Sequence, residues 1–224
     1  MKIGLLVIGA IRSSPSEILE HLVKAKESFL FEHNGCINEV TTIFCTWEPS
    51  NKIHIKCGVN YYYDYNKNEL VEKIQNYTDL IIFMDNLDYK IIPQMMNQFP
   101  PLFAYQLSYL QEYIKTQNIE FDYIVRYRND LKVDLYDIKL YFNTKTYITP
   151  AYWRNELYLQ QLSDHFFIMP FSKFVSLPLS IDTINKITPD CWDNEEVNNK
   201  LINPDIVIHP REIRAYKVRD RVFQ

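Results

Sequence analysis

Residues 2–10 read KIGLLVIGA, a continuous apolar run that contains Val and Ile. A run of this kind predicts a strand that is buried on both faces, as in the middle of a parallel sheet. It ends at Gly9 and Ala10, and Arg12 follows almost at once. Because the run is too short to span a bilayer, it predicts a first strand and not a membrane or targeting segment.

The residues after this run predict a helix that packs on the strand. Apolar side chains recur at helical spacing between Ile18 and Phe29. Ser14 before Pro15, or Ser13 with Ser16, offers an N-cap for this helix, and Gly35 is expected to end it. The segment NEVTTIFCTW at 38–47 then predicts a second strand.

Strands and helices continue to alternate up to residue 130. The predicted elements are, in order, a strand at 52–58, a polar aromatic loop at 60–69, a helix near 67–77, a strand or helix start at 78–86, an amphipathic helix at 100–118 and a strand at 121–130. This alternation predicts an α/β, Rossmann-like layered fold with a mostly parallel central sheet flanked by helices. The second half is less regular, with short strands and a helix over DNEEVNNKLI at 193–202.

The composition sets limits on the ligand and the compartment. The chain has 224 residues, of which 47% are hydrophobic, and a net charge of −4, which argues against nucleic acid as a partner. An anionic ligand would therefore need a local cluster of Arg or Lys. The four cysteines form no CxxC pair, so we expect reduced thiols in a cytoplasmic protein without a transmembrane segment. The aromatic content of 15% fits either core filling or the stacking of sugar rings.

Several widespread motifs are missing from the sequence. The chain contains four glycines and neither a GxxxxGK[ST] nor a GxGxxG segment, which excludes a P-loop and a dinucleotide fingerprint. GxSxG and HExxH are absent as well, so no motif supports a serine hydrolase or a zinc protease. The search for a site therefore turns to the ends of the predicted strands.

Charged and polar residues follow three of these strands. In open α/β sheets, ligands bind beyond the carboxyl ends of the strands. The candidates for cofactor binding at these ends are Gly9, Arg12, Thr46, Trp47, Arg126, Arg128 and Asp130. Arginines, a carboxylate and an aromatic ring together could hold a diphosphate, a metal ion and a flat base.

Each of these residues also has a structural explanation. Arg12 could be a solvated loop residue, and Trp47 could pack in the core or at its rim. Arg126, Arg128 and Asp130 alternate along one strand, so they could form a salt-bridge ladder. Burying an arginine in a central strand is costly without a partner, and both explanations therefore require a carboxylate or an anionic ligand.

One family shows the same pattern. FDYIVRYRNDL at 121–131 resembles the YD-x-x-x-R-x-R-x-D-L segment of glycosyltransferase-like proteins with the GT-A fold. These proteins build bacterial or viral surface polysaccharides and include the WavE-like group of lipopolysaccharide synthesis. Further segments resemble other parts of these proteins in the same order, namely LLVIGAIR, IFCTWEP, LSDHFFIMP and NEEVNNKLI. The resemblance covers most of the chain.

The resemblance implies a single GT-A-like domain over 1–224, with a nucleotide-binding half at 1–130 and an acceptor-side half at 131–224. It implies a nucleotide-sugar donor and a glycan acceptor as partners. Asp130 would hold a divalent metal ion, Mn²⁺ or Mg²⁺, at the position of the family's DxD motif. The sequence departs from that motif, because Lys132 stands where a second carboxylate is expected. Either Asp130 alone holds the metal together with the phosphates, or Lys132 or an arginine replaces the metal as the stabilising charge.

The transfer reaction assigns further roles. Negative charge develops on the leaving diphosphate, where Arg12 and Arg128 would stabilise it. If the enzyme inverts, a base deprotonates the acceptor hydroxyl. The first candidate for this catalytic role is Asp164 in SDHFF, with Glu195 and Glu196 behind it. Asp164 could instead cap the structure that follows it.

Two other functions fit the same residues. The missing second carboxylate would suit a non-catalytic domain that binds a glycan or a protein partner on a degenerate transferase fold. A phosphate grip would equally suit another phosphate-handling enzyme, such as a nucleotidyltransferase or a phosphodiesterase. The three functions differ in their products. A glycosyltransferase makes a glycoside, and a binding domain makes no product. Another phosphate-handling enzyme releases pyrophosphate or cleaves a phosphodiester.

Overall fold

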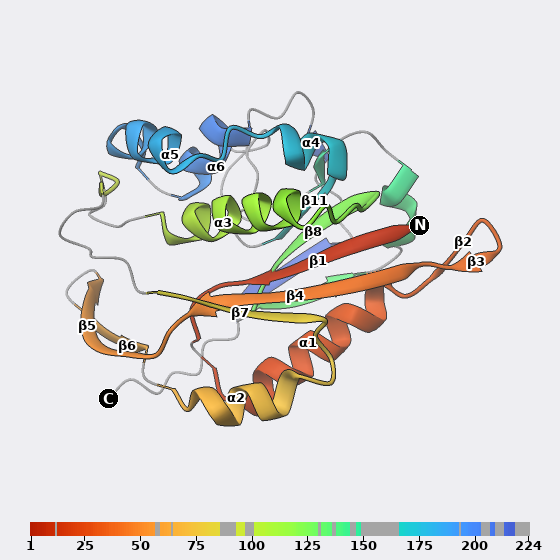
Figure 1. The fold of residues 1–224 in the computed structure, drawn as a ribbon, viewed down its shortest axis with the longest axis horizontal. Helices are drawn as coiled ribbons and strands as arrows, with labels where there is room; N and C mark the ends of the chain where they lie inside the picture. Colours follow the sequence, from red (N-terminus) through yellow and green to blue (C-terminus); the bar gives the residue numbers. More distant parts are fainter. Residues whose placement is uncertain are drawn as a thin grey trace.

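The structure is a computed structural model of the chain (Figure 1). It describes residues 1–11, 13–56, 59–63, 65–85, 93–96, 101–129, 131–135, 138–143, 147–148, 166–192, 194–202, 207–208 and 213–217. Arg12, Asp130 and Asp164 lie outside this part of the chain.

A seven-stranded sheet forms the centre of the fold. Its strands are β12 (Val207–Ile208), β10 (Tyr147–Ile148), β11 (Phe166–Pro170), β8 (Tyr123–Arg128), β1 (Lys2–Ile8), β4 (Glu39–Trp47) and β7 (Leu80–Met84), in that spatial order. The neighbours β8, β1, β4 and β7 all pair in parallel, whereas β11 runs antiparallel to β8. The predicted α/β fold with a mostly parallel sheet is therefore confirmed, and Leu80–Met84 within the segment at 78–86 forms a strand.

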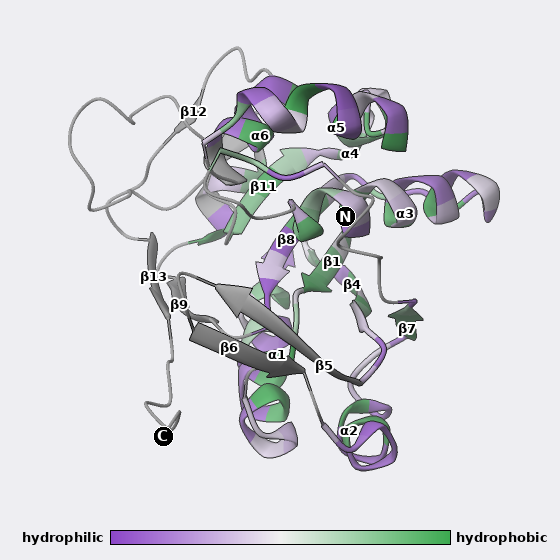
Figure 2. Ribbon diagram, turned by 90° about the vertical axis from the view of Figure 1, so that its left-hand side faces the viewer, coloured by the Kyte–Doolittle hydropathy of each residue, from purple (hydrophilic) through white to green (hydrophobic). Residues whose placement is uncertain are grey.

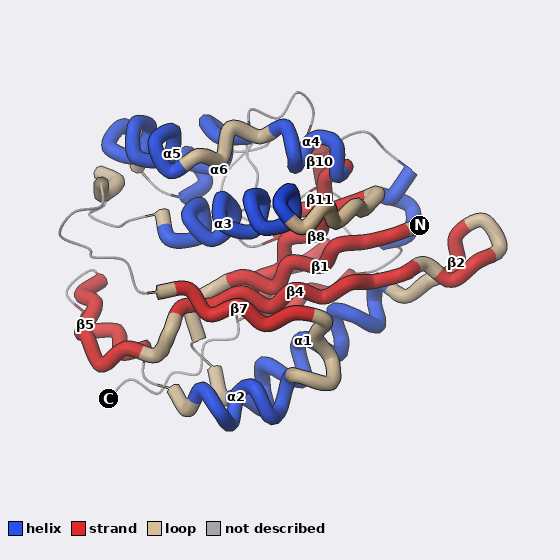
Figure 3. Tube along the Cα trace, in the orientation of Figure 1, coloured by secondary structure: helices blue, strands red, loops and turns tan. Residues whose placement is uncertain are grey.

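Helices cover both faces of the sheet (Figures 1 and 3). Helices α1 (Pro15–Phe29) and α2 (Lys67–Ile74) lie on one face and share a core cluster with Leu5, Val7 and Val125. Helices α3 (Leu102–Thr116), α4 (Phe171–Ser176), α5 (Ile181–Ile187) and α6 (Asn194–Ile202) lie on the other face and share a second cluster with Leu6 and Ile8. The described residues also include the 3-10 helices η1 (Ile138–Asn143) and η3 (Thr188–Asp190). No helix among the described residues is long and apolar enough to cross a membrane.

The order of the strands reverses beside β1. The chain runs from β1 outward to β4 and β7, with α1 and α2 on one face, and then returns through α3 on the opposite face to β8. Strand β8 therefore pairs with the other side of β1. In open α/β sheets, ligands bind at the carboxyl edge beside such a reversal. A ligand site is therefore expected where β1 and β8 end.

The first helix begins as predicted and ends earlier than predicted. Ser14 and Glu17 form a capping box, with the Glu17 amide 3.3 Å from the Ser14 hydroxyl. The helix stops at Phe29, so the prediction that Gly35 ends it was wrong. Gly35 lies instead in the turn of a hairpin between β2 (Glu32–His33) and β3 (Cys36–Ile37). Its φ of 79° explains why a glycine stands there.

Two more antiparallel strand pairs lie outside the central sheet in the described part of the chain. Strand β5 (Ser50–Lys56) pairs antiparallel with β6 (Val59–Tyr63), so the prediction of a loop over the start of 60–69 was wrong. The run of tyrosines in β6 has high strand propensity, which outweighed the polar residues around it. Strand β9 (Leu131–Leu135) pairs antiparallel with β13 (Ile213–Lys217), which places Asp134 opposite Arg214 in the register.

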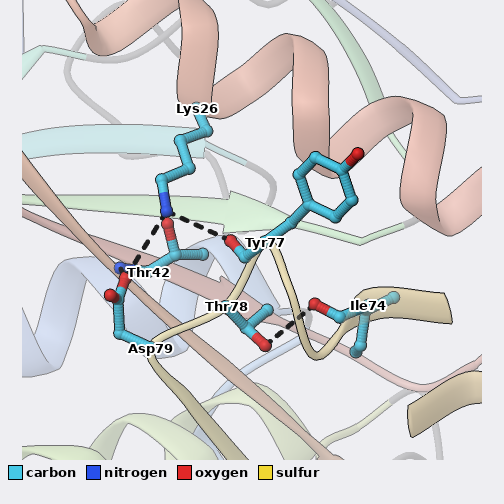
Figure 4. Close-up of polar contacts among 6 residues, drawn as sticks. All are labelled: Lys26, Thr42, Ile74, Tyr77, Thr78 and Asp79. Carbon is cyan, nitrogen blue, oxygen red and sulfur yellow. Dashed lines mark hydrogen bonds and ion pairs between the residues drawn. The ribbon is translucent and has the colours of Figure 1, made fainter. Parts of the chain in front are cut away.

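A polar cluster joins α1 to the sheet near the start of β7 (Figure 4). The Asp79 carboxylate accepts a hydrogen bond from the Thr42 amide at 2.7 Å and lies 3.7 Å from the Lys26 ammonium. Lys26 also donates to the Tyr77 carbonyl at 3.3 Å. The Thr42 hydroxyl is buried, however, and finds no hydrogen-bond partner among the described residues. A buried hydroxyl without a partner lowers the stability of the folded state.

Replacing Thr42 with valine should therefore raise the free energy of unfolding. Valine keeps the branched shape of threonine and removes the buried hydroxyl, so we expect a gain of about 1 kcal/mol. Chemical denaturation of the wild type and Thr42→Val measures this change directly. Because the backbone bond from Thr42 to Asp79 is retained, a large loss of stability would contradict this description of the hydroxyl.

Candidate functional site

The carboxyl ends of β4, β1 and β8 reach the same level of the sheet. In the register of the parallel pairs, Ile8 lies beside Cys45 on one side and beside Arg128 on the other. The next residue of each strand is therefore Gly9, Thr46 or Asn129, and these three lie side by side. Figure 2 shows the end of β1 in the green of hydrophobic residues, whereas β8 carries the purple of hydrophilic ones. The predicted convergence of these strand ends is thus present in the fold.

Gly9 is the centre of this edge. Its carbonyl oxygen accepts two hydrogen bonds, one from the Thr46 hydroxyl at 2.8 Å and one from the Asn129 side-chain amide at 3.1 Å. A Cβ atom on Gly9 would lie 2.8 Å from the Asn129 Oδ1 atom and 3.5 Å from the Arg128 Cγ atom, and the φ of Gly9 is 154°. The predicted need for a glycine is therefore explained, because both the backbone conformation and the neighbours leave no room for a side chain.

Two arginines bring positive charge to the end of β8. Arg126 is 1% exposed, and its guanidinium carbon lies 5.5 Å from the centre of the Phe103 ring at the start of α3. Because side chains alternate along a strand, Arg128 lies on the same α3 face, one step closer to the edge. It is only half-buried. A cation held this deep in the fold requires compensating negative charge or ring contacts, and Phe103 supplies part of that compensation.

The end of β4 is closed by its own side chains. Thr46 is fully buried, and Trp47 is 4% exposed within the core cluster of the α3 face. The Trp47 carbonyl accepts a hydrogen bond from the Tyr65 hydroxyl at 2.6 Å. Burial and the neighbouring Glu48 carboxylate raise the pKa of the Tyr65 phenol well above its ordinary value, so Tyr65 remains a donor. Both cofactor-binding candidates on β4 therefore have side chains engaged in packing and backbone support.

Glu48 makes a separate contact at the same end of β4. Its carboxylate pairs with the Lys67 ammonium at 2.5 Å, and that ammonium also lies 4.2 Å from the centre of the Phe83 ring. These contacts tie the start of α2 to the ends of β4 and β7. The positive charge of Lys67 is thus engaged by protein groups.

The catalytic candidates lie in different situations. The Glu196 carboxylate accepts a hydrogen bond from the Trp192 amide at 2.6 Å, at the start of α6. This contact is typical of a residue in the first turn that caps its own helix. Glu195 lies in the same turn. Asp164, together with Arg12 and Asp130, falls outside the described residues, so the roles of all these residues stay predictions.

The chemistry of a divalent metal needs a set of converging ligands. Among the residues that the structure describes, no three His, Cys, Asp or Glu side chains come together in a way that could hold a metal ion. The metal prediction therefore depends on Asp130.

Analysis of the sequence missed one residue of this edge. Asn129 was not among the candidates for cofactor binding, yet it is 2% exposed and holds the Gly9 carbonyl. Its Oδ1 atom is buried without a hydrogen-bond partner among the described residues. An asparagine directly after a central strand was the available signal, since its amide can donate to a backbone carbonyl across the strand ends.

Comparison with known proteins finds distant structural neighbours. No protein-family profile and no curated protein sequence matches the chain. A crystal structure of the galactosyltransferase LgtC with donor and acceptor sugar analogues has 13% identity and a TM-score of 0.49, and the alignment covers 93% of this chain and 73% of that one. An active-site mutant of LgtC gives 13% identity and a TM-score of 0.48, with 93% and 72% coverage.

A nucleotidyltransferase is similar to the same degree. A putative glucose-1-phosphate thymidylyltransferase from Bacillus anthracis, crystallised with a sucrose, has 8% identity and a TM-score of 0.48, and the alignment covers 99% of this chain and 92% of that one. With every TM-score below 0.5, these similarities do not distinguish one activity from another. The function must therefore be argued from the sheet edge itself.

Proposed function

We propose that the protein is a glycosyltransferase that moves a sugar from a nucleotide-sugar donor to a glycan acceptor in the synthesis of a surface polysaccharide. The donor diphosphate would bind at the carboxyl edge where β1 and β8 meet. Residues 1–130 would form the nucleotide-binding half, and residues 131–224 would form the acceptor-side half. The RxRxD pattern and the other segments that resemble polysaccharide-building proteins of the WavE-like group support this proposal.

The observation that carries the proposal is the position of Arg128 beside Gly9 at the reversal of strand order. A chain with net charge −4 attracts no anion by its overall field. A fixed guanidinium at the edge where α/β proteins bind ligands gives a local site for a diphosphate, which it can contact through two parallel hydrogen bonds.

The residues of the edge would act on the leaving group. In the transfer, the bond between the anomeric carbon and the diphosphate oxygen breaks, and a bond to the acceptor oxygen forms. Arg128, with Arg12, which follows β1 in the sequence, would stabilise the charge that develops on the diphosphate. Asp164, Glu195 or Glu196 would accept the proton of the acceptor hydroxyl if the configuration inverts. A divalent metal at Asp130 would add Lewis-acid stabilisation to the same oxygen atoms.

A panel of nucleotide-sugars tests the proposal. Wild-type protein is heated with UDP-, GDP- or CMP-linked sugars, with and without Mn²⁺, and the midpoint of unfolding is measured. A donor at a hundred times its dissociation constant should raise the midpoint by about 5–10 °C. If Asp130 holds a metal, Mn²⁺ should increase this shift of the unfolding midpoint in the wild type. In Asp130→Ala, the shift should be the same with and without Mn²⁺.

The reaction products distinguish the proposed glycosyltransferase from the two alternative functions. Transfer of sugar to a glycan with release of the nucleotide supports it. Glycan binding without any turnover would instead identify a non-catalytic domain, and release of pyrophosphate from a nucleoside triphosphate and a sugar phosphate would identify a nucleotidyltransferase. A complete lack of stabilisation by nucleotide-sugars, at ligand concentrations up to the millimolar range, would refute the proposed function.

A further inference from the structure

The Gly9 carbonyl is held from both neighbouring strands. The Thr46 hydroxyl reaches it from β4, and the Asn129 amide reaches it from the end of β8. Both donors come from residues with 0% and 2% exposure, so water does not compete for these bonds. Two buried donors on one carbonyl fix the orientation of the peptide group that joins Gly9 to Ala10.

The direction of this carbonyl follows from the alternation of β4. Cys45 and Trp47 belong to the core cluster of the α3 face, so Thr46 between them lies on the α1 face. The Gly9 carbonyl, which accepts from the Thr46 hydroxyl, therefore points toward the α1 face. Because the carbonyl and the N–H of a trans peptide group point in opposite directions, the N–H of Ala10 points toward the α3 face.

The Ala10 N–H is available to a ligand. Within the part of the chain that the structure describes, it donates no hydrogen bond, although Ala10 is half-buried. Arg128 lies on the same α3 face, beside the end of β1. A backbone donor and a guanidinium on one side of the sheet edge together match an anionic oxygen group, since both donate to oxygen.

We propose that Thr46 and Asn129 are positioning residues of the donor site, which orient the Ala10 N–H toward a phosphate of the bound nucleotide. This inference rests on the proposed function and adds a specific route by which two buried residues affect binding. It changes the interpretation of Thr46, which the sequence suggested as a direct ligand contact. Its hydroxyl acts through the Gly9 carbonyl.

Matched variants of Thr46 test the inference. Thr46→Val removes the hydroxyl and keeps the shape, whereas Thr46→Ser keeps the hydroxyl, and Asn129→Leu removes the amide donor at nearly constant size without adding a charge. Thr42→Val is the control, because it removes a buried hydroxyl of the same strand that holds no described group. The probes are UDP and GDP, each compared with its nucleoside, and dissociation constants are measured by calorimetry.

Thr46→Val and Asn129→Leu should each weaken binding of the nucleoside diphosphate about tenfold, which is the typical effect of one hydrogen bond to a charged group. Thr46→Ser and Thr42→Val should bind it as the wild type does, and nucleoside binding should be unchanged throughout. Equal weakening of diphosphate and nucleoside, or wild-type affinity in Thr46→Val, overturns the inference and leaves the proposed function standing. A wild type that binds neither UDP nor GDP overturns the inference together with the proposed UDP or GDP donor.

Discussion

Arg128→Ala should lose at least about a hundredfold in affinity for the nucleoside diphosphate, because a bidentate contact between a guanidinium and a phosphate contributes roughly 3 kcal/mol. The side chain is half-buried at the end of β8, so the variant should still fold. Arg128→Lys should recover part of the affinity, since lysine restores the charge without the planar pair of donors. Calorimetric titration with the diphosphate measures both variants.

The control for this prediction is Lys24→Ala. It removes the same unit of positive charge from the exposed side of α1, where Lys24 pairs with Glu20. If the effect of Arg128 arose from the overall charge of the protein, the two variants would weaken binding equally. Such equality, or unchanged affinity in Arg128→Ala, would contradict a diphosphate site at the end of β8.

Gly9→Ala should reduce both stability and ligand binding. The new Cβ atom would lie 2.8 Å from the Asn129 Oδ1 atom, and the backbone has a φ of 154°. Steric displacement of Asn129 together with backbone strain should cost about 2–4 kcal/mol. Because Asn129 would no longer hold the Gly9 carbonyl, binding of the nucleoside diphosphate should fall as well. Denaturant unfolding and calorimetry check the two parts separately.

Gly35→Ala separates strain from steric contact. Gly35 also has a positive φ, of 79°, but a Cβ atom there would meet nothing within 4 Å. Its substitution should cost about 1 kcal/mol through strain alone and leave ligand binding unchanged. If Gly9→Ala proved as mild as Gly35→Ala, the packing of Asn129 against Gly9 would not have the importance that we give it.

The sequence predicted the fold well where hydrophobic patterns were long. The runs of β1, β4 and β8 and the stripe of α3 were sufficient for the parallel sheet, because strands buried on both faces carry few polar residues. The sequence-based prediction was wrong where one residue type is typical of two local structures. Gly35 fits a helix end and a hairpin turn equally, since both need a positive φ.

The sequence predicted which strand ends meet at the site, but it did not predict the contacts that their side chains make. The sequence indicated that Gly9, Thr46 and Arg128 would meet, because parallel strands end at one edge. It could not indicate that the Thr46 hydroxyl is buried, since burial depends on the Gly9 backbone and on neighbouring strands. The role of Asn129 could not be predicted either, because it depends on the register between β1 and β8.

The central claim is that a nucleotide diphosphate binds at the edge between β1 and β8. A crystal structure of the wild type with the nucleoside diphosphate that stabilises it most tests this claim directly. We expect phosphate oxygens at hydrogen-bonding distance, about 3 Å, from the Ala10 amide nitrogen and the Arg128 guanidinium. A diphosphate bound at any other place, with Arg128 and Ala10 free of contact to it, would contradict the account.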